Sequence, residues 1–169
     1  MNSSIVQVTP SLRRRLACWV YEGVLLFGIV MVAGFAYSTL TQQRHAMIGT
    51  TGLRAVVFVV LGLYFAGFWS SRGQTLAMQT WKIRLVSASG DRVTWLRAAV
   101  RYLLSWLWFL PALLSLHLAG LSGTADSLIA VAVGVVAYAA LAWLRPDRQY
   151  WHDAICGTRL VLVQPQVRP

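Results

Sequence analysis

A long apolar run that contains one carboxylate constrains this chain more than any other feature. Within residues 16–35 the only charged side chain is Glu22, and three consecutive arginines at residues 13–15 lead into the run. The hydrocarbon layer of a membrane takes about 20 apolar residues of α-helix at about 1.5 Å each, so residues 16–40 are predicted to span a membrane. Glu22 then needs an explanation, because a charge inside a span is costly unless it faces protein or water.

The composition also indicates a membrane protein. Hydrophobic residues make up 57% of the 169 residues and charged residues only 12%, about half the charged share of a soluble domain. A net charge of +10 would suggest nucleic acid for a soluble protein, but here the cations lie between apolar runs. We therefore expect the partner to be a lipid bilayer with anionic lipids at its cytoplasmic face, and not nucleic acid. A homo-oligomer or another membrane protein is the protein partner to consider.

The hydropathy pattern predicts an all-α membrane protein. Four transmembrane helices are expected, at about residues 16–40, 55–71, 102–121 and 127–144. A short cytoplasmic β-hairpin is expected between the second and third helices, because residues 83–86 alternate partly in polarity and residues 87–91 have turn chemistry. Residues 1–14 and 164–169 are expected to form tails around one membrane domain, residues 15–163.

The distribution of basic residues predicts the orientation of these spans. Pro111 predicts a kink in the third span, or an interfacial stretch that bends into the bilayer. If that span still crosses the membrane, both termini and the loop of residues 72–101 lie on the same side. That side then has thirteen basic residues, and the other side has two, Arg44 and Arg54. The positive-inside rule then places both termini in the cytoplasm.

Small and aromatic residues predict how the spans are packed and anchored. Four small residues would let a neighbouring helix approach the first span closely: Gly23, Gly28, Ala33 and Gly34. Tryptophans near the cytoplasmic side are expected to serve as interfacial anchors: Trp19, Trp69, Trp95 and Trp143.

Arg15 and Glu22 form the first candidate site. They are seven residues apart, so they share one helix face, about 10 Å apart along the axis. In the functional interpretation Glu22 titrates or coordinates a cation and Arg15 tunes it. In the structural interpretation the two form a buried salt bridge that fixes the helix against its neighbours. Both interpretations stay open at the level of sequence.

Residues 151–158 contain the second candidate site. His152 and Asp153 follow the fourth span at the cytoplasmic surface, from which Asp153 could reach the arginines that begin the first span. A histidine beside an aspartate suggests proton handling, and a helix cap or a surface pair is the alternative. His45 and His117 are expected across the membrane, so we expect no metal site and no cofactor. The chain shows no activated nucleophile and no nucleotide-binding motif, so an enzyme is not expected.

The order and spacing of three short motifs resemble the RDD family of small bacterial membrane proteins. The motifs are Arg15 with Glu22 seven residues later, Arg72-Gly73-Gln74-Thr75 followed by the strand-like residues 83–86, and His152-Asp153 followed by Gly157-Thr158. The resemblance implies a protein of the bacterial inner membrane and adds Arg72 and Thr75 to the polar site. The family is named for an arginine and two aspartates, and Glu22 replaces the first aspartate here. A helix-packing ion pair tolerates the extra methylene better than a tight cation site does.

The resemblance implies a transport role, including cation/proton exchange for some members. We therefore predict that the chain takes part in transport of an ion or small solute through the site formed by Arg15, Glu22 and Asp153. The alternative is a non-transporting membrane scaffold or partner-binding subunit, which would bind through residues 72–101 or through a glycine-lined helix face.

Overall fold

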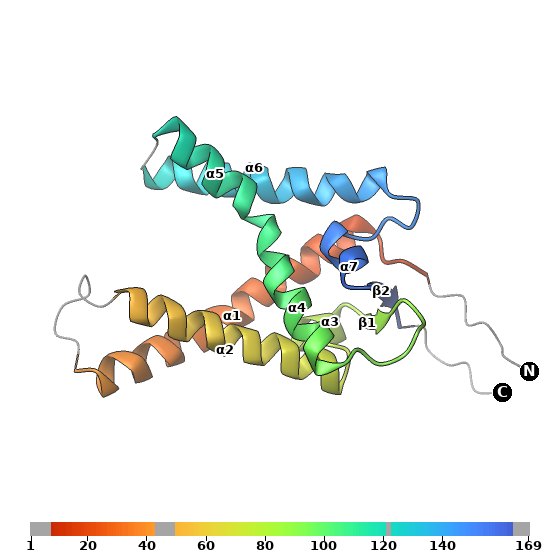
Figure 1. Ribbon diagram of the computed structural model, residues 1–169, viewed down its shortest axis with the longest axis horizontal. Coiled ribbons are helices and arrows are strands. Elements are labelled where there is room, and N and C mark those ends of the chain that lie inside the picture. Colours follow the sequence, from red (N-terminus) through yellow and green to blue (C-terminus); the bar gives the residue numbers. More distant parts are fainter. Residues whose placement is uncertain (1–7, 43–49, 121–122, 164–169) are drawn as a thin grey trace, which may run out of the picture.

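Two long helices that lie side by side open the chain (Figure 1). The computed structural model describes residues 8–42, 50–120 and 123–163, without the side chains of residues 110 and 111. The first helix, α1, spans Leu12–Leu40, and α2 spans Thr50–Ser71. Ser11 caps α1, because its side chain accepts a hydrogen bond from the backbone N–H of Arg14. Most of the two predicted tails, residues 1–7 and 164–169, lies outside the described residues.

The burial pattern of α1 is the reverse of the pattern in a water-soluble protein. The buried residues of α1 are Arg15, Cys18 and Glu22, whereas Val32 and Phe35 are 70% and 76% exposed. Acyl chains solvate such an apolar outer face, and the polar side chains are then hidden inside the protein. The surface of α1 is therefore suited to lipid.

A bent helical segment follows the polar centre of the chain. It consists of α4 (Trp95–Ser105), the short helix η1 (Trp106–Trp108) and α5 (Leu110–Ala119). The axis bends by 40° between η1 and the body of α5, and a proline stands in the first turn of α5. The break therefore falls where Pro111 predicts a kink.

The last long helical segment is α6 (Thr124–Ala140), which continues into η2 (Leu141–Leu144). Within the described residues, three segments are long and apolar enough to cross a membrane: α1, α2 and Thr124–Leu144. The number rises to four if the bent segment counts as one span. The predicted count of four thus depends on the bent segment crossing as a unit.

The small sheet is not the predicted hairpin, and that prediction was wrong. Strand β1 (Ile83–Ser87) pairs antiparallel with β2 (Thr158–Leu162), near the other end of the chain. After β1 the chain turns back at once, and the N–H of Ser87 donates to the carbonyl of Asp91 at 2.9 Å. The residues that follow lead directly into α4. β2 offers apolar side chains that are buried on pairing with β1, among them Leu160, so it is the better partner.

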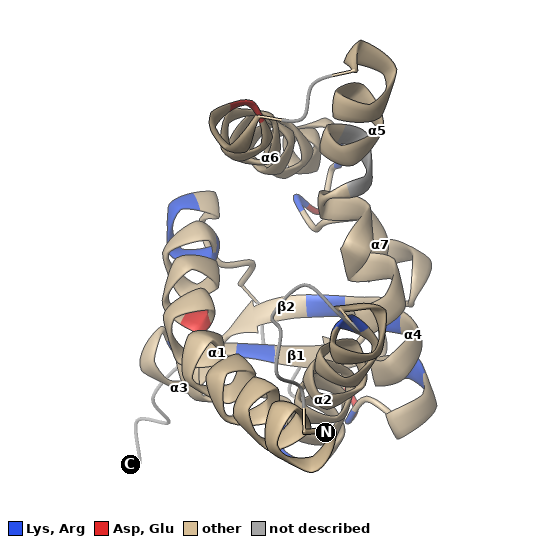
Figure 2. Ribbon diagram, turned by 90° about the vertical axis from the view of Figure 1, so that its left-hand side faces the viewer, with Lys and Arg blue, Asp and Glu red and all other residues tan. Residues whose placement is uncertain are grey.

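The sheet and two short helices, α3 (Leu76–Thr80) and α7 (Trp151–Ile155), gather at one end of the molecule (Figure 1). The N–H of Leu162 donates to the carbonyl of Val8 at 2.9 Å. The two ends of the described chain therefore lie together. Figure 2 shows basic segments at the start of α1, on both strands and on α4, and a single acidic position on α1.

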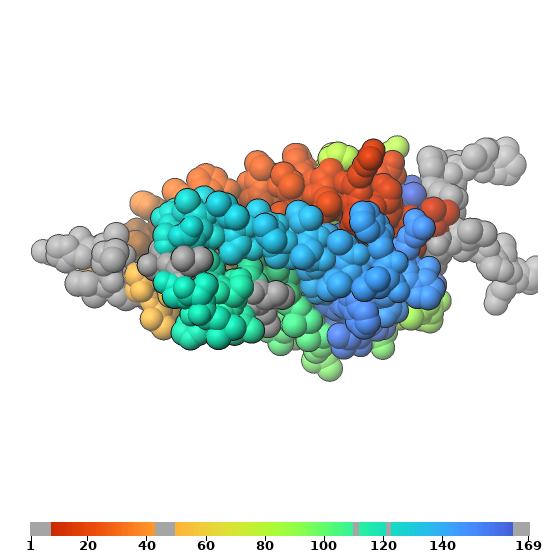
Figure 3. All heavy atoms as spheres, turned by 90° about the horizontal axis from the view of Figure 1, so that it is seen from above, coloured from red at the N-terminus to blue at the C-terminus, as the bar shows by residue number. Residues whose placement is uncertain are grey.

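The long helices form two layers, α1 with α2 and α5 with α6, and α4 crosses between them (Figure 1). Seen from above, α5 and α6 lie over the middle of the molecule beside α1 (Figure 3). Glycine permits close packing at Gly134, where a Cβ would lie 2.8 Å from the side chain of Ala112. At Gly23 and Gly28 a Cβ would meet no described atom within 4 Å, so the predicted close approach is not found there. At Gly34 a Cβ would lie 4.0 Å from the side chain of Leu53, on α2.

The tryptophans predicted as anchors divide into two groups. Trp19, Trp95 and Trp143 are exposed, as residues at a membrane interface should be. Trp69 is buried inside the protein, so its assignment as an anchor was wrong.

Candidate functional site

Glu22 lies inside the molecule between α1, α2 and the start of α3. One carboxylate oxygen accepts a hydrogen bond from the hydroxyl of Tyr64 at 2.8 Å, and the other accepts one from the hydroxyl of Thr75. Glu22 is 7% exposed and Thr75 is fully buried. One hydroxyl donor on each oxygen gives the buried carboxylate the partners that it needs. Glu22 therefore ties three helices together.

The segment from Gly73 to Thr75 folds so that a hydroxyl reaches Glu22. Gly73 has φ +68°, a left-handed conformation that favours glycine, and its carbonyl accepts a 2.7 Å hydrogen bond from the backbone of β1. The side chain of Gln74 donates to the first carbonyl of β1 at 2.7 Å. Thr75 caps α3, because its hydroxyl accepts a backbone N–H of that helix while it donates to Glu22.

A second polar cluster joins α4 to α7. Nε of Arg101 donates to Oδ1 of Asp153 at 2.7 Å, and both side chains are buried. The guanidinium of Arg101 also lies over the ring of Trp69, 4.1 Å from its centroid. The sequence suggested that Asp153 could reach the arginines that begin the first span. The structure instead pairs Asp153 with Arg101.

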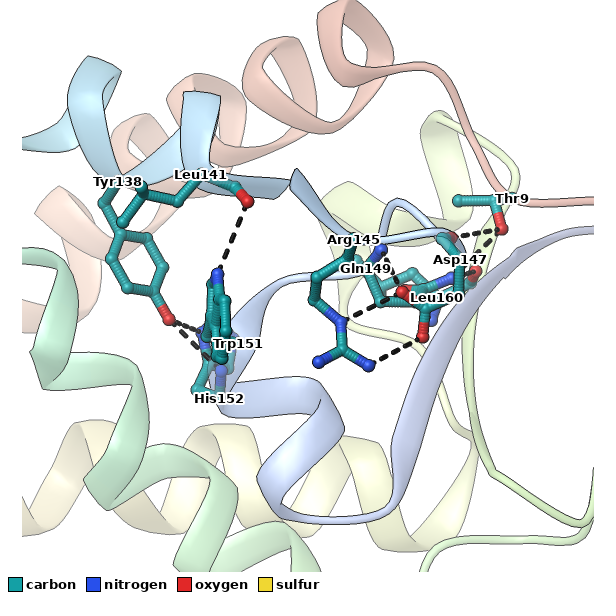
Figure 4. A network of polar contacts seen from close by, with 9 residues as sticks. All are labelled: Thr9, Tyr138, Leu141, Arg145, Asp147, Gln149, Trp151, His152 and Leu160. Carbon is teal, nitrogen blue, oxygen red and sulfur yellow. Dashed lines mark hydrogen bonds and ion pairs between the residues drawn. The ribbon is translucent and has the colours of Figure 1, made fainter. Parts of the chain in front are cut away.

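His152 lies against Tyr138 (Figure 4). Its Nε2 also lies near Asp153. The hydroxyl oxygen of Tyr138 accepts the backbone N–H of His152 at 3.2 Å, and the same oxygen lies 2.9 Å from Nδ1 of the imidazole. The Tyr138 hydroxyl is therefore assigned as the donor and Nδ1 as the acceptor. The neutral imidazole then carries its proton on Nε2, 3.4 Å from Oδ1 of Asp153. Burial lowers the pKa of His152 to about 4, against the attraction of Asp153. The imidazole is therefore neutral at neutral pH.

Arg15 lies over the ring of Tyr150, with its guanidinium carbon 4.4 Å from the centroid. Burial raises the pKa of Tyr150 to about 12, so the ring is an uncharged phenol. Nε and Nη1 of Arg15 are buried and have no hydrogen-bond partner among the described residues. In the described part of the chain Arg15 forms no salt bridge with Glu22, whose two oxygens are bonded to hydroxyls.

A polar network around Gln149 fixes the segment between α6 and α7 (Figure 4). The side chain of Gln149 accepts the N–H of Leu160 at 2.9 Å and donates to the carbonyl of the same residue at 3.0 Å, as a neighbouring strand would. It also donates to the hydroxyl of Thr9 at 3.1 Å. Arg145 binds Asp147 through two hydrogen bonds of 3.0 and 3.1 Å. These contacts hold the residues before α7 against both ends of the described chain.

A cavity of about 1040 Å³ lies between the two helix layers. Arg15, Glu22, Arg101 and His152 contribute to its lining, and most of the remaining lining is apolar. Four ionisable side chains from α1, α4 and α7 thus meet at one space.

The other predicted site residues lie behind the cavity or away from it. Thr75 and Asp153 are fully buried and bind the lining residues Glu22 and Arg101. Arg72 is exposed and belongs to a second cavity, of about 410 Å³. The structure therefore brings five of the six predicted residues together and leaves Arg72 outside.

Three residues of these clusters were missed by the sequence reasoning: Tyr64, Arg101 and Tyr138. Tyr64 and Tyr138 each stand inside an apolar run. A hydroxyl in such a run needs a partner, and this was the signal that could have found them. Nothing in the sequence indicates that Arg101 is the partner of Asp153, because the two are 52 residues apart. Among the described residues, no three His, Cys, Asp or Glu side chains are placed to hold a metal ion.

The apolar outer faces of the helices and the buried polar clusters define a membrane protein of the helical class. The RDD family model matches residues 9–157. The chain belongs to the RDD family. Searches of curated proteins and of solved structures found no match.

Proposed function

We propose that this RDD family member is a multi-pass protein of a bacterial inner membrane, and that it takes part in transport of an ion or small solute. The observation that carries the proposal is the cavity between the helix layers, in which Arg15, Glu22 and Arg101 stand among mostly apolar lining residues. Ionisable side chains within membrane segments that face a common cavity are typical of substrate and ion pathways.

The proposed orientation has both termini in the cytoplasm. The hydrogen bond between Leu162 and Val8 joins the two ends of the described chain, which supports an even number of crossings. The bent segment with α6 would then supply the third and fourth crossings. In the sequence, thirteen basic residues fall in the two end segments and residues 72–101, against two between the first two spans, and this excess favours the cytoplasm for both termini.

Glu22 is the residue that we propose to bind the transported cation or proton. Its carboxylate lies beside two hydroxyl oxygens, those of Tyr64 and Thr75. A carboxylate and two hydroxyls form a set of oxygen ligands suited to a hard cation. The same hydroxyls would hold the empty carboxylate in place between transport cycles.

Flux measurements on the purified chain in reconstituted vesicles test this proposal. We expect the wild-type chain to move at least one ion of a panel, and Glu22→Gln to abolish that flux because it removes the charge and keeps the size. Asp147→Asn is the matched control, since Asp147 is an exposed acid that does not line the cavity. Normal flux in Glu22→Gln would reject the assignment of the site. Absence of flux across the whole panel would reject ion transport. Absence of flux for a second panel of small solutes as well would reject transport and favour the scaffold.

A further inference from the structure

Arg15 is a buried cation whose charge is not matched by a partner within the described residues. It is 4% exposed, and its Nε and Nη1 have no hydrogen-bond partner there. Stacking on Tyr150 covers one face of the guanidinium but supplies no negative charge. A buried charge is strongly unfavourable unless a counter-charge neutralises it. Because Arg15 lines the large cavity, an anion in that cavity can supply the counter-charge.

The rest of the cavity indicates what kind of anion fits. Beyond Arg15 the walls are formed largely by apolar side chains, most of them from α1, α2 and the segment of α4 and η1, among them Val24, Phe27 and Leu61. Such walls suit a hydrocarbon chain and give no hydrogen bonds to a small hydrated anion. The volume, about 1040 Å³, also far exceeds the space that an inorganic anion needs. We propose that the cavity binds one anionic phospholipid, with its phosphate beside Arg15 and an acyl chain along the apolar walls.

The position of Arg15 along α1 agrees with a lipid headgroup. Arg15 is the fourth residue of α1, so it lies about 5 Å from the start of the helix, and basic residues at the end of a span attract anionic headgroups. Glu22 lines the same cavity about 10 Å further along the axis. Its carboxylate would repel a phosphate that moved deeper, so the two charges together fix the depth of the headgroup. This site goes beyond the proposed transport and does not require flux.

Native mass spectrometry of the purified full chain, offered equal amounts of phosphatidylglycerol and phosphatidylcholine, tests the proposal. We expect the wild-type chain to retain one phosphatidylglycerol in preference to phosphatidylcholine. Arg15→Gln should lower that retention about tenfold, the loss expected for one charge-assisted contact. Arg14→Gln is the matched control, because Arg14 is an exposed arginine on the same helical turn. No lipid preference in the wild type, or equal retention by the two variants, would overturn the proposal.

A second pair of variants tests the apolar part of the cavity without touching Arg15. Val24→Trp would fill space in the cavity and should lower phosphatidylglycerol retention, whereas Val32→Trp changes an exposed residue of α1 outside the lining and should not. If Arg15→Gln does not fold, this pair decides: equal retention by the two overturns the proposal.

Excess inorganic phosphate separates a lipid from a soluble anion. Inorganic phosphate should fail to displace phosphatidylglycerol from the wild-type chain. If phosphate does displace it, and Arg15→Gln abolishes this effect, the ligand of the cavity is a soluble anion and the lipid proposal is overturned. The two proposals also fail separately. If the chain binds phosphatidylglycerol but moves no ion, the lipid site stands and the transport proposal fails. If the chain moves ions but shows no lipid preference, the transport proposal stands and the lipid site fails.

Discussion

Arg15 and Arg101 are two buried arginines that line the same cavity and differ in their partners. Each lies over an aromatic ring, Arg15 over Tyr150 at 4.4 Å and Arg101 over Trp69 at 4.1 Å. Their exposed fractions are 4% and 6%. Arg101 has Asp153 at 2.7 Å, whereas Arg15 has no acidic partner among the described residues.

This difference separates a charge that belongs to the architecture from a charge that is left for a ligand. The pair of Arg101 and Asp153 joins α4 to α7, and α7 leads directly into β2. Removing one member would leave the other as an uncompensated buried charge. Arg15 is already in that situation, so its removal should cost little stability. The comparison therefore predicts a large loss of stability when the pair of Arg101 and Asp153 is broken, and only a small change when Arg15 is replaced.

The largest effect is expected for Asp153→Asn, which would leave Arg101 without its counter-charge. The free energy of unfolding should fall by about 3–5 kcal/mol, the cost of breaking a buried ion pair. Titration with sodium dodecyl sulfate in mixed micelles measures it. Asp147→Asn is the control, because the pair of Asp147 and Arg145 is partly exposed and should contribute less than about 1 kcal/mol. Equal losses in the two variants would contradict the comparison.

The next effect is a loss of stability in acid that comes from His152, which faces Asp153 and Tyr138. Burial lowers its pKa to about 4 from an ordinary value of 6.5. Between these values the unfolded chain binds more protons than the folded chain, so stability falls as the pH drops from 6.5 to 4. The decrease in the free energy of unfolding that His152 causes is on the order of 3 kcal/mol, and it is complete below pH 4.

Unfolding titrations at a series of pH values measure this dependence. His152→Gln is the comparison variant, because glutamine keeps an acceptor and a donor and does not titrate. The variant should lose that part of the slope between pH 6.5 and 4. An unchanged slope would mean that other groups cause the acid sensitivity.

The smallest effect on stability is expected for Arg15→Gln. Removing an unpaired buried cation ends a desolvation cost while losing one stacking contact, so the free energy of unfolding should change by less than about 1 kcal/mol. The free energy of unfolding is measured in micelles free of phospholipid, so that no lipid can bind at Arg15. Arg14→Gln, which replaces an exposed arginine, is the control. A loss of several kcal/mol would show that Arg15 is architectural, as Arg101 is.

The sequence predicted the helices better than it predicted the partners of the polar residues. The apolar run at residues 16–40 corresponds to α1, and Pro111 marks the bend before α5. The hairpin prediction failed because a strand pattern shows that residues 83–86 will pair but does not show with which segment. Glu22 was singled out because a lone carboxylate in an apolar run must have a partner. Its partners, Tyr64 and Thr75, are 42 and 53 residues away.

Hydropathy along the chain determined by itself that this protein lies in a membrane, because each apolar run must find an apolar solvent whatever its neighbours are. The order of short motifs likewise identified the RDD family. Only the tertiary structure decided that Arg101 has an acidic partner and that Arg15 has none within residues 8–42, 50–120 and 123–163. Charge compensation depends on distances between segments far apart in the chain, and local sequence does not encode these distances.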